Sequence, residues 1–335
     1  MPRLRRTSPD DVGWTRRRAG KGFVYLDADG RRLTDEEAAR CKALVIPPAW
    51  QDVWICTAGN GHLQAVGTDD AGRRQYLYHP AWREQRDNLK HARVLGFGKA
   101  LSRAREQILT DLGAAGMPLD RACATAARLL DLGYFRIGND VYADTNGSFG
   151  LTTLQRRHVR RKADELVFSF EGKSGVEHTI RIDDPAAIAS LDVMRRRRGG
   201  EQLLAWKDGR DWKDLSASHV NDYLRATLPS VGDDGYTAKD FRTWHATVLA
   251  AAALAESDEP GETKASRKRA VSSAMKEVAD FLGNTPTLAR SSYVDPRVVD
   301  LYEEGVTIQN ATRRHHRTVD ERQAALERAV LKLLR

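Results

Sequence analysis

The stretch FLGNTPTLARSSYVDP, residues 281–296, decides the fold of the C-terminal half of this chain. Gly283 is typical of the end of a helix, and Asn284-Thr285-Pro286 opens a second helix with proline in its first turn, where proline is tolerated. Tyr293 falls near the end of that short helix, which Asp295-Pro296 stops. A single tyrosine is usually a core or surface residue, so its meaning depends on other segments.

Three upstream segments bear on the interpretation of that tyrosine: YFRIGND at 134–140, FEGKSG at 170–175 and KDFRTWH at 239–245. In the first, Gly138 lies two residues after Arg136, and glycine near an arginine lets the backbone approach a phosphate closely. In the second, Lys173 occupies the tip of a turn between two expected strands. A lysine whose pKa is lowered by neighbouring cations can give up a proton. Each residue alone is more typical of a solvated surface.

The third segment belongs to a helix expected at 237–255. Lys239 and Arg242 are three positions apart on that helix and therefore share a face. The residues that mark its buried face are Phe241, Trp244 and Val248. Two cations beside a core stripe are ordinary, so their interpretation also depends on the combination.

In combination these positions suit phosphoryl transfer to a tyrosine. They supply two arginines, lysines, an amide at Asn284 and a tyrosine, without a carboxylate cluster, a metal-ligand set or a Walker-type loop. Arginine forks and an amide can surround the non-bridging oxygens and neutralise transition-state charge. A lysine can protonate the leaving alkoxide, and the tyrosine oxygen can form a covalent intermediate. GFGKA at 96–100 has the wrong spacing for a phosphate loop and is interpreted as a helix start.

Basic residues are in excess and clustered. The 335 residues include 54 Lys and Arg against 46 Asp and Glu, which gives a formal net charge of +8. Five basic runs spread over both halves favour a long anionic ligand such as nucleic acid over a small one. The runs lie at 3–6, 16–18, 156–162, 195–198 and 267–269.

The remaining composition indicates a reducing compartment. Cys41, Cys56 and Cys123 are far apart and form no CxxC pair, so we expect reduced thiols and no thiolate metal site. No apolar run approaches membrane-spanning length, and no apolar region of a signal peptide follows the basic start. We therefore expect no membrane partner and a cytoplasmic, nucleoid-associated location.

The pattern of elements predicts two domains in an α+β fold. A small N-terminal domain, residues 1–93, carries a capping box at 34–37 that opens a helix to about residue 44. Its strands are expected at 23–26, 53–56, 62–66 and 74–78. A helix from 80 to about 94 leads into a mainly helical domain, residues 94–335, with strands at 166–170 and 177–182. Its helices are expected at 98–112, 119–132, 152–163, 185–195, 216–227, 237–255, 263–282, 286–293, 296–304 and 318–334.

Together the motifs resemble the type IB DNA topoisomerases of the compact bacterial and poxvirus kind, from about Val45 to Tyr302. Matched by motif, the catalytic residues of that family fall on Arg136, Lys173, Arg242, Asn284 and Tyr293. Poxvirus and eukaryotic members have histidine where this chain has Asn284, and bacterial members resemble this chain in using asparagine. Either side chain can donate a neutral hydrogen bond to a non-bridging oxygen.

A fifth segment, GTDDAGRRQYLYH at 67–79, is similar to the DNA-contact strand of the same family. The resemblance implies DNA contacts for Gln75, Tyr76 and Tyr78. Alternation along a strand predicts that the two tyrosines share a face, opposite Gln75 and Leu77. Two more expected DNA-contact residues lie beside the catalytic arginines, Gly138 and Lys239.

The resemblance implies a two-lobed clamp, in which residues 1–93 and 94–335 close around supercoiled duplex DNA. Tyr293 would attack one strand, leaving a 3′-phosphotyrosine and a free 5′-hydroxyl. The broken strand would rotate about the intact strand before the hydroxyl attacks back. Because the tyrosyl ester conserves the phosphodiester energy, no ATP, metal ion or other cofactor is expected, and the family suggests a monomer.

Two alternatives stay open on sequence alone. A tyrosine recombinase shares the catalytic logic and fold, but recombinases usually carry His-x-x-Arg where this chain has Lys239-Asp-Phe-Arg242, the form found in the topoisomerases. The second alternative is a DNA-binding protein without catalysis. Substitution of Tyr293 by Phe separates that alternative from an enzyme, because binding alone does not need the phenol.

Overall fold

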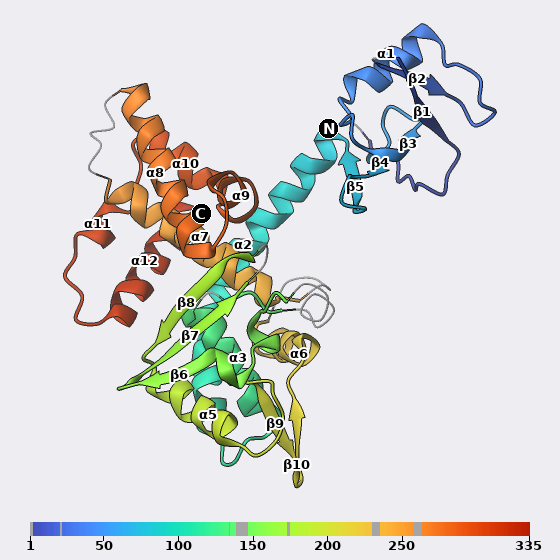
Figure 1. Ribbon diagram of the computed structural model, residues 1–335. Coiled ribbons are helices and arrows are strands. Elements are labelled where there is room, and N and C mark those ends of the chain that lie inside the picture. The colour runs from blue at the N-terminus through green and yellow to red at the C-terminus, as the bar shows by residue number, and fades with distance from the viewer. Residues whose placement is uncertain are drawn as a thin grey trace. The chain divides into compact units, whose positions relative to one another are not determined.

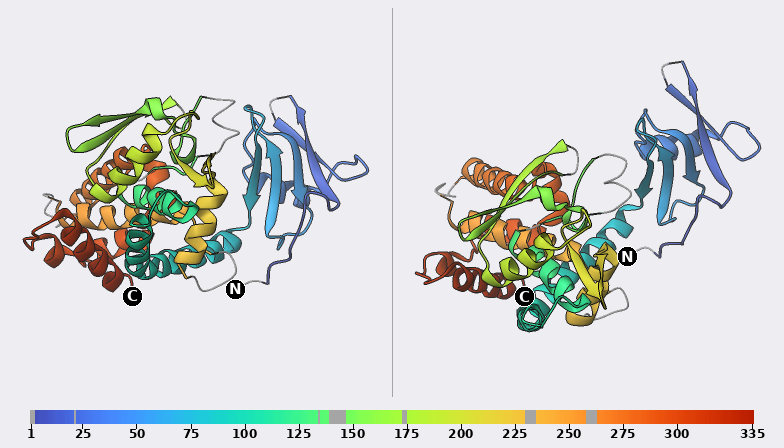
Figure 2. Two further views of the ribbon diagram at one scale, coloured as in Figure 1. Left: turned by 90° about the horizontal axis from the view of Figure 1, so that it is seen from below. Right: turned by 60° about the horizontal axis from the view of Figure 1, so that its bottom comes forward.

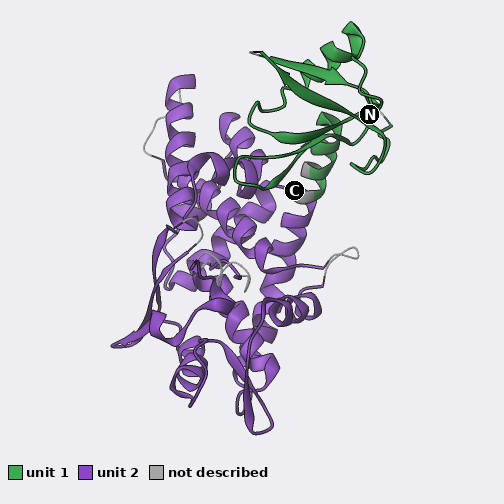
Figure 3. Ribbon diagram, turned by 45° about the vertical axis from the view of Figure 1, so that its right-hand side comes forward, with its two compact units in different colours: residues 1–91 green, residues 92–335 purple. Residues whose placement is uncertain are grey.

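The computed structural model describes residues 3–20, 22–133, 135–138, 147–172, 175–229, 235–257 and 263–335. The chain divides into two compact units, residues 1–91 and 92–335 (Figure 3). Both contain helices and small antiparallel sheets, and helices dominate the second unit (Figure 1). The mixed helical and β character expected from the sequence is confirmed. The sequence predicts a division after residue 93, and the roles assigned to the two domains stay predictions.

The first unit is built around a five-stranded antiparallel sheet in the order β2-β1-β3-β4-β5. Its elements are β1 (Gly13–Ala19), β2 (Gly22–Leu26), α1 (Asp35–Ala43), β3 (Gln51–Cys56), β4 (Leu63–Thr68) and β5 (Arg74–Tyr78). The expected capping box opens α1, with Thr34 and Glu37 exchanging hydrogen bonds. Side chains of the sheet and of α1 share one small core, which includes Tyr25, Cys41 and Ile55.

Strand β1 was not expected, because its sequence reads as a basic run. The strand pairs with β2 and β3, and its three arginines, 16–18, lie on the ladder with β2. The guanidinium of Arg16 turns back and donates to the backbone carbonyls of Ile46, Pro47 and Trp50. At least one cation of that run is therefore structural.

A single long helix, α2 (Pro80–Leu112), replaces the two helices expected at 80–94 and 98–112. The expectation that GFGKA starts a helix is wrong, because the two glycines lie inside α2. A Cβ at Gly96 would meet the hydroxyl of Tyr236 at 2.3 Å, and one at Gly98 would meet the Trp244 ring at 2.6 Å. Close packing against later residues explains these glycines, which therefore do not mark a helix start.

The core of the second unit surrounds α7 (Ala238–Ala255), which packs on α3 (Leu119–Gly133) and α8 (Lys264–Leu282). The stripe predicted for the buried face of α7 is confirmed, since Phe241 and Trp244 have no exposed surface and Val248 has 2%. Other helices are α5 (Pro185–Arg196), α6 (Ala217–Thr227), α9 (Pro286–Leu288), α10 (Pro296–Glu303), α11 (Gln309–Thr312) and α12 (Val319–Leu333). Those expected at 185–195, 216–227, 296–304 and 318–334 are confirmed within a residue or two.

The second unit also carries a three-stranded antiparallel sheet in the order β6-β7-β8. The strands are β6 (Val159–Lys162), β7 (Glu165–Glu171) and β8 (Glu177–Ile182), so the expected strand pair around the EGKSG turn is confirmed. The helix expected at 152–163 is wrong. Its apolar residue Val159 is buried and pairs with Phe168 across the ladder, and this tertiary contact overrides the local pattern.

A hairpin of this unit was missed, and the packing of its last helix was left open by the sequence. A hairpin of β9 (Ala205–Asp208) and β10 (Asp211–Asp214) forms its own two-stranded sheet. The C-terminal helix α12 lies beside other helices of the unit in both views of Figure 2 and packs on α7 and α11. Within the described part of the chain, every helix is too short or too polar to cross a membrane.

Candidate active site

The C-terminal end of α8 gathers two arginines. Gly283 follows the helix in the left-handed conformation, with φ 61° and ψ 50°, which glycine adopts without strain. The last carbonyls of a helix lack intrahelical partners and carry the negative end of its dipole. Arg242 donates from Nη2 to the carbonyl of Leu282 at 2.7 Å, and Arg136 donates from Nη2 to that of Gly283 at 3.0 Å.

Asn284 joins this cluster through its side chain. Its Oδ1 accepts a 2.6 Å hydrogen bond from Nη2 of Arg136. Its Nδ2 is buried, and among the described residues no acceptor lies within hydrogen-bonding distance of it. Nε of Arg136 is likewise buried without an acceptor in the described part of the chain. Buried donors are normally satisfied, so these two atoms mark a place where an anionic ligand can supply acceptors.

Backbone pairing sets the position of Arg136. The carbonyls of Arg136 and Ile137 accept hydrogen bonds from the amides of Leu151 and Thr152 at 2.7 and 2.8 Å. Gly138 has φ 96°, and its Cα lies only 2.4 Å from where a Cβ on Gly150 would be. The close crossing therefore requires glycine at position 150, and the positive φ favours glycine at position 138.

Arg242 is a nearly buried cation, with 6% of its surface exposed. Burial lowers the pKa of its guanidinium to about 10, and the charge of Arg136 contributes in the same direction. At that pKa the side chain is still protonated at neutral pH. Two arginine charges held this close together favour the binding of an anion at this place.

Tyr293 ends a π-helical turn, Ala289–Tyr293, that follows α9. The helix expected at 286–293 is thus a short α-helix continued by a π-turn, a feature frequent at functional sites. The guanidinium carbon of Arg242 lies 5.5 Å from the centre of the Tyr293 ring. Burial by itself raises the pKa of this phenol, but the charges of Arg242 and Arg136 and a hydrogen bond with Arg242 lower it below its usual value.

The backbone of the tyrosine is tied to α7. The hydroxyl of Thr247 accepts a 3.2 Å hydrogen bond from the amide of Asp295 and lies 3.4 Å from the carbonyl oxygen of Tyr293. Asp295 is buried and caps α10. Thr247 therefore holds the backbone directly after the tyrosine, and it was not singled out from the sequence.

The predicted lysines differ in what can be said of them. Lys173 lies outside the described residues, so its position at the hairpin tip stays a prediction. The strands that flank it are in place, because β7 ends at Glu171 and β8 begins at Glu177. Lys239 is exposed on α7, and its charge also lowers the pKa of Tyr293.

The expected DNA-contact strand is β5 of the first unit. Tyr76 is 47% exposed and its ring stacks on that of Tyr78, with 6.3 Å between centres and 18° between planes. Gln75 lies on the opposite side and donates to Asp69 at 2.9 Å. Its amide therefore has an intramolecular partner, whereas Tyr76 is exposed and Tyr78 is half-buried.

A cleft of about 500 Å³ adjoins the two arginines of the second unit. Side chains of β8 and the end of α8 line it together with the segment around Arg136. His178 of β8 also lines this cleft. It was not singled out from the sequence, because part of its surroundings, Gly283, is distant along the chain. Among the described residues, no group of three or more His, Cys, Asp or Glu side chains is arranged to hold a metal ion.

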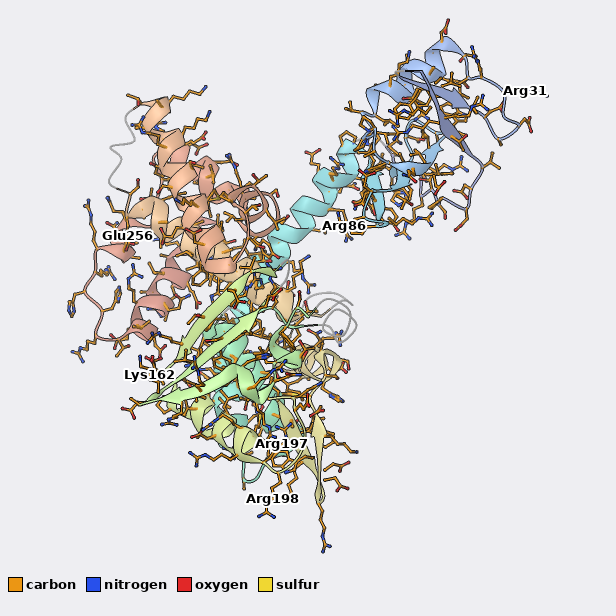
Figure 4. All side chains as sticks on the ribbon, in the orientation of Figure 1. Arg31, Arg86, Lys162, Arg197, Arg198 and Glu256 are labelled. Carbon is orange, nitrogen blue, oxygen red and sulfur yellow. The ribbon has the colours of Figure 1, made fainter. Side chains whose placement is uncertain are left out.

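The basic runs are only partly a surface for a ligand. Arg197 is buried, and its guanidinium donates to the carbonyls of Met194 and Leu203 at 2.9 and 3.0 Å. Arg156 donates to the carbonyl of Arg197 at 2.6 Å. By contrast, Arg198 extends away from the ribbon in Figure 4. The basic runs of the sequence thus include both arginines that stabilise the fold and arginines that are exposed.

Comparison with known proteins agrees on one family. A family model described as the catalytic core of eukaryotic DNA topoisomerase I matches residues 79–319. A model of the N-terminal domain of bacterial DNA topoisomerase IB matches residues 22–69. The chain is 26% identical over 298 residues to DNA topoisomerase 1B of Acanthamoeba polyphaga mimivirus, covering 87% of this chain and 88% of that protein.

More distant relatives point the same way. DNA topoisomerase 1B of vaccinia virus (strain Copenhagen) is 20% identical over 239 residues, which cover 71% of this chain and 72% of the viral protein. DNA topoisomerase 1 of Schizosaccharomyces pombe is 28% identical over 142 residues, 41% of this chain and 16% of the yeast protein. The similarity extends across most of the chain, so it does not rest on a single motif.

Proposed function

The chain belongs to the type IB DNA topoisomerases, and from this premise we propose that it relaxes supercoiled duplex DNA by cutting one strand with Tyr293. The phenol loses its proton, and its oxygen forms a bond to the phosphorus. The bond from phosphorus to the 5′-oxygen breaks, which leaves a 3′-phosphotyrosine and a 5′-hydroxyl. After strand rotation the hydroxyl attacks back and releases the tyrosine.

The cations at the end of α8 supply the electrostatic part of this reaction. Arg136 and Arg242 neutralise charge that develops on the non-bridging oxygens, and the free amide hydrogens of Asn284 donate to one of them. The same cations make Tyr293 more acidic, so more of it is available as the phenolate at a given pH. One pair of arginines therefore activates the nucleophile and stabilises the transition state.

Lys173 is proposed as the general acid that protonates the departing 5′-oxygen. Since the phosphoryl group passes to the tyrosine and back without hydrolysis, its bond energy is retained and ATP is not consumed. We propose that the reaction also proceeds without a metal ion or other cofactor, with side-chain cations in that role.

The two units are proposed to hold the duplex as a clamp. Gln75, Tyr76 and Tyr78 of β5 contact DNA from the first unit, while Gly138 and Lys239 do so beside the catalytic residues. The exposed Tyr76, with its ring stacked on Tyr78, supports this assignment, because aromatic side chains and their hydroxyls suit contacts with bases and backbone. We propose that one copy of the chain is sufficient and that it acts on the nucleoid in the cytoplasm.

The observation that carries the proposal is the convergence of Arg136, Arg242, Asn284 and Tyr293 at the end of one helix. A suicide duplex, in which the strand 3′ of the cut is too short to stay bound, tests it by trapping the covalent intermediate. We expect an adduct of wild-type protein and none of Tyr293→Phe, and peptide mapping should place the nucleotide on Tyr293. An adduct on another residue would contradict the assignment.

A further inference from the structure

His178 occupies a position that the proposed reaction does not yet use. It lies on β8 with its ring stacked on Phe170, at 5.3 Å between ring centres and 27° between planes. It also stands in the 500 Å³ cleft that Arg136 and Arg242 adjoin. The ring is thus held against the ring of Phe170, in the cleft that both arginines line.

Two glycines from distant parts of the chain make room for this ring. A Cβ on Gly172, at the end of the β7 hairpin arm, would lie 2.5 Å from Cδ2 of His178. A Cβ on Gly283, after α8, would lie 2.4 Å from Cε1 of the same ring. Real Cβ atoms do not approach this closely, so the imidazole fills the gap between the hairpin and the end of α8.

The second glycine connects the ring to the catalytic groups. Gly283 presents its carbonyl to Arg136 and is followed directly by Asn284, which binds the same guanidinium nitrogen. We propose that His178 is a positioning residue for strand cleavage: its ring supports the Gly283–Asn284 turn and so fixes Arg136 and Asn284 against the scissile phosphate. The inference rests on the proposed function of that site.

The charges around the ring favour a neutral wedge. Burial lowers the pKa of His178, and the nearby charges of Arg136 and Arg242 lower it further, although Glu177 opposes them. Asp280 of α8 and Arg181 of β8 line the same cleft. A neutral ring adds no third cation to the arginine pair. His178 therefore supports the site through its shape and not through a charge.

The test is single-turnover cleavage with two substrates, one with an ordinary 5′-oxygen and one with a 5′-bridging sulfur that leaves without a proton. We expect His178→Ala to slow cleavage of both substrates by on the order of 10–100-fold, the cost of a misplaced catalytic group. Lys173→Ala, as the contrast, should be slow only with oxygen. His178→Phe keeps a flat ring and should cleave within about threefold of wild type, since a packing role needs no ring nitrogen.

Coupling to the turn provides the second readout. If His178 acts through Asn284, adding His178→Ala to Asn284→Ala should cost much less than it costs in the wild-type background. Sulfur rescue of His178→Ala, additive effects with Asn284→Ala, or unchanged cleavage by the alanine variant would each overturn the proposal. If wild-type protein formed no adduct on Tyr293, the proposed function itself would fail, which is a separate result.

Thermal unfolding of each variant guards against a trivial explanation. Should His178→Ala not fold, Gly283→Ala replaces it, because its Cβ pushes on the ring from the opposite side. That variant should slow both substrates as well, and His178→Phe remains the control with the wedge intact. Normal cleavage by Gly283→Ala would then contradict the proposed support of the turn.

Discussion

At the scale of single residues, Tyr293 is the proposed nucleophile, and the acidity of its phenol depends on its neighbours. Burial opposes ionisation of the phenol, and the charges of Arg242 and Arg136 outweigh burial. The lowered pKa is thus a product of two cations that are themselves held by helix carbonyls. The arrangement links the local backbone at the end of α8 to the chemistry of a side chain ten residues later.

Substitution of Arg242 by Gln tests this link. Losing the cation raises the pKa of Tyr293, so the rise of the cleavage rate with pH should move to higher pH. The maximal rate should also fall on the order of 10²–10³-fold, because a donor to the transition-state oxygens is lost. Single-turnover cleavage measured between pH 6 and 10 reports both effects.

The matched control for that experiment is Arg103→Gln, which removes an exposed arginine of α2. Its pH profile should coincide with that of the wild type. If Arg242→Gln lowered the rate without moving the profile, Arg242 would stabilise the transition state but would not set the acidity of the phenol.

Much of the site was predictable at this scale because its residues lie in short motifs with characteristic neighbours. Arg136, Arg242, Asn284 and Tyr293 were chosen in that way, and the structure brings these four together. His178 was not predictable, since its meaning comes from contacts with Gly172 and Gly283, the second of them more than a hundred residues away. Single residues that act by shape leave no local pattern.

At the scale of elements, most helices followed from capping and periodicity, as at α5, α6 and α10. The errors came where tertiary packing decides. Val159 of β6 pairs across a ladder with Phe168, and the glycines of α2 serve close packing with Tyr236 and Trp244. The periodicity of a sequence does not reveal which residues a short strand pairs with or which side chains pack against a glycine.

The C-terminal helix α12 is an integral part of the second unit. Glu327 on this helix is 3% exposed and binds Arg105 of α2, with 2.7 Å between Oε2 and Nη1. The same guanidinium binds Asp131 of α3 at 2.8 Å. A charge cluster therefore ties three helices together next to the core.

Glu327→Gln should destabilise the protein, because a buried hydrogen bond between charged groups is replaced by a weaker one. Such bonds contribute roughly 1.5–3 kcal/mol, so we expect a loss of about 2 kcal/mol in the free energy of unfolding. Chemical denaturation measures it. Glu303→Gln, the same change at an exposed position of α10, should leave stability unchanged within about 0.5 kcal/mol. Equal stability of the two variants would refute the role assigned to the cluster.

At the scale of the whole molecule, the excess of basic residues favours a long anionic ligand, although some arginines stabilise the fold instead. Backbone carbonyls accept hydrogen bonds from the guanidinium groups of Arg16, Arg156 and Arg197. The net charge of +8 includes them. The number of phosphate contacts is therefore smaller than the sequence runs suggest, but it is still expected to be large.

The affinity for duplex DNA should consequently fall steeply with salt. A protein that makes six or more phosphate contacts loses about a thousandfold or more in affinity between 50 and 200 mM salt. Fluorescence anisotropy of a labelled duplex with the Tyr293→Phe protein, which binds without cutting, gives the slope directly. A flat response would contradict binding through an extensive basic surface.

The most direct test of the central claim is relaxation of plasmid DNA by the pure protein in EDTA without ATP, beside Tyr293→Phe. Both negatively and positively supercoiled plasmids serve as substrates. We predict that wild-type protein relaxes both signs and that the variant relaxes neither while still binding duplex DNA. Relaxation that survives in Tyr293→Phe, or that wild-type protein performs only with a metal ion or ATP, would contradict the account.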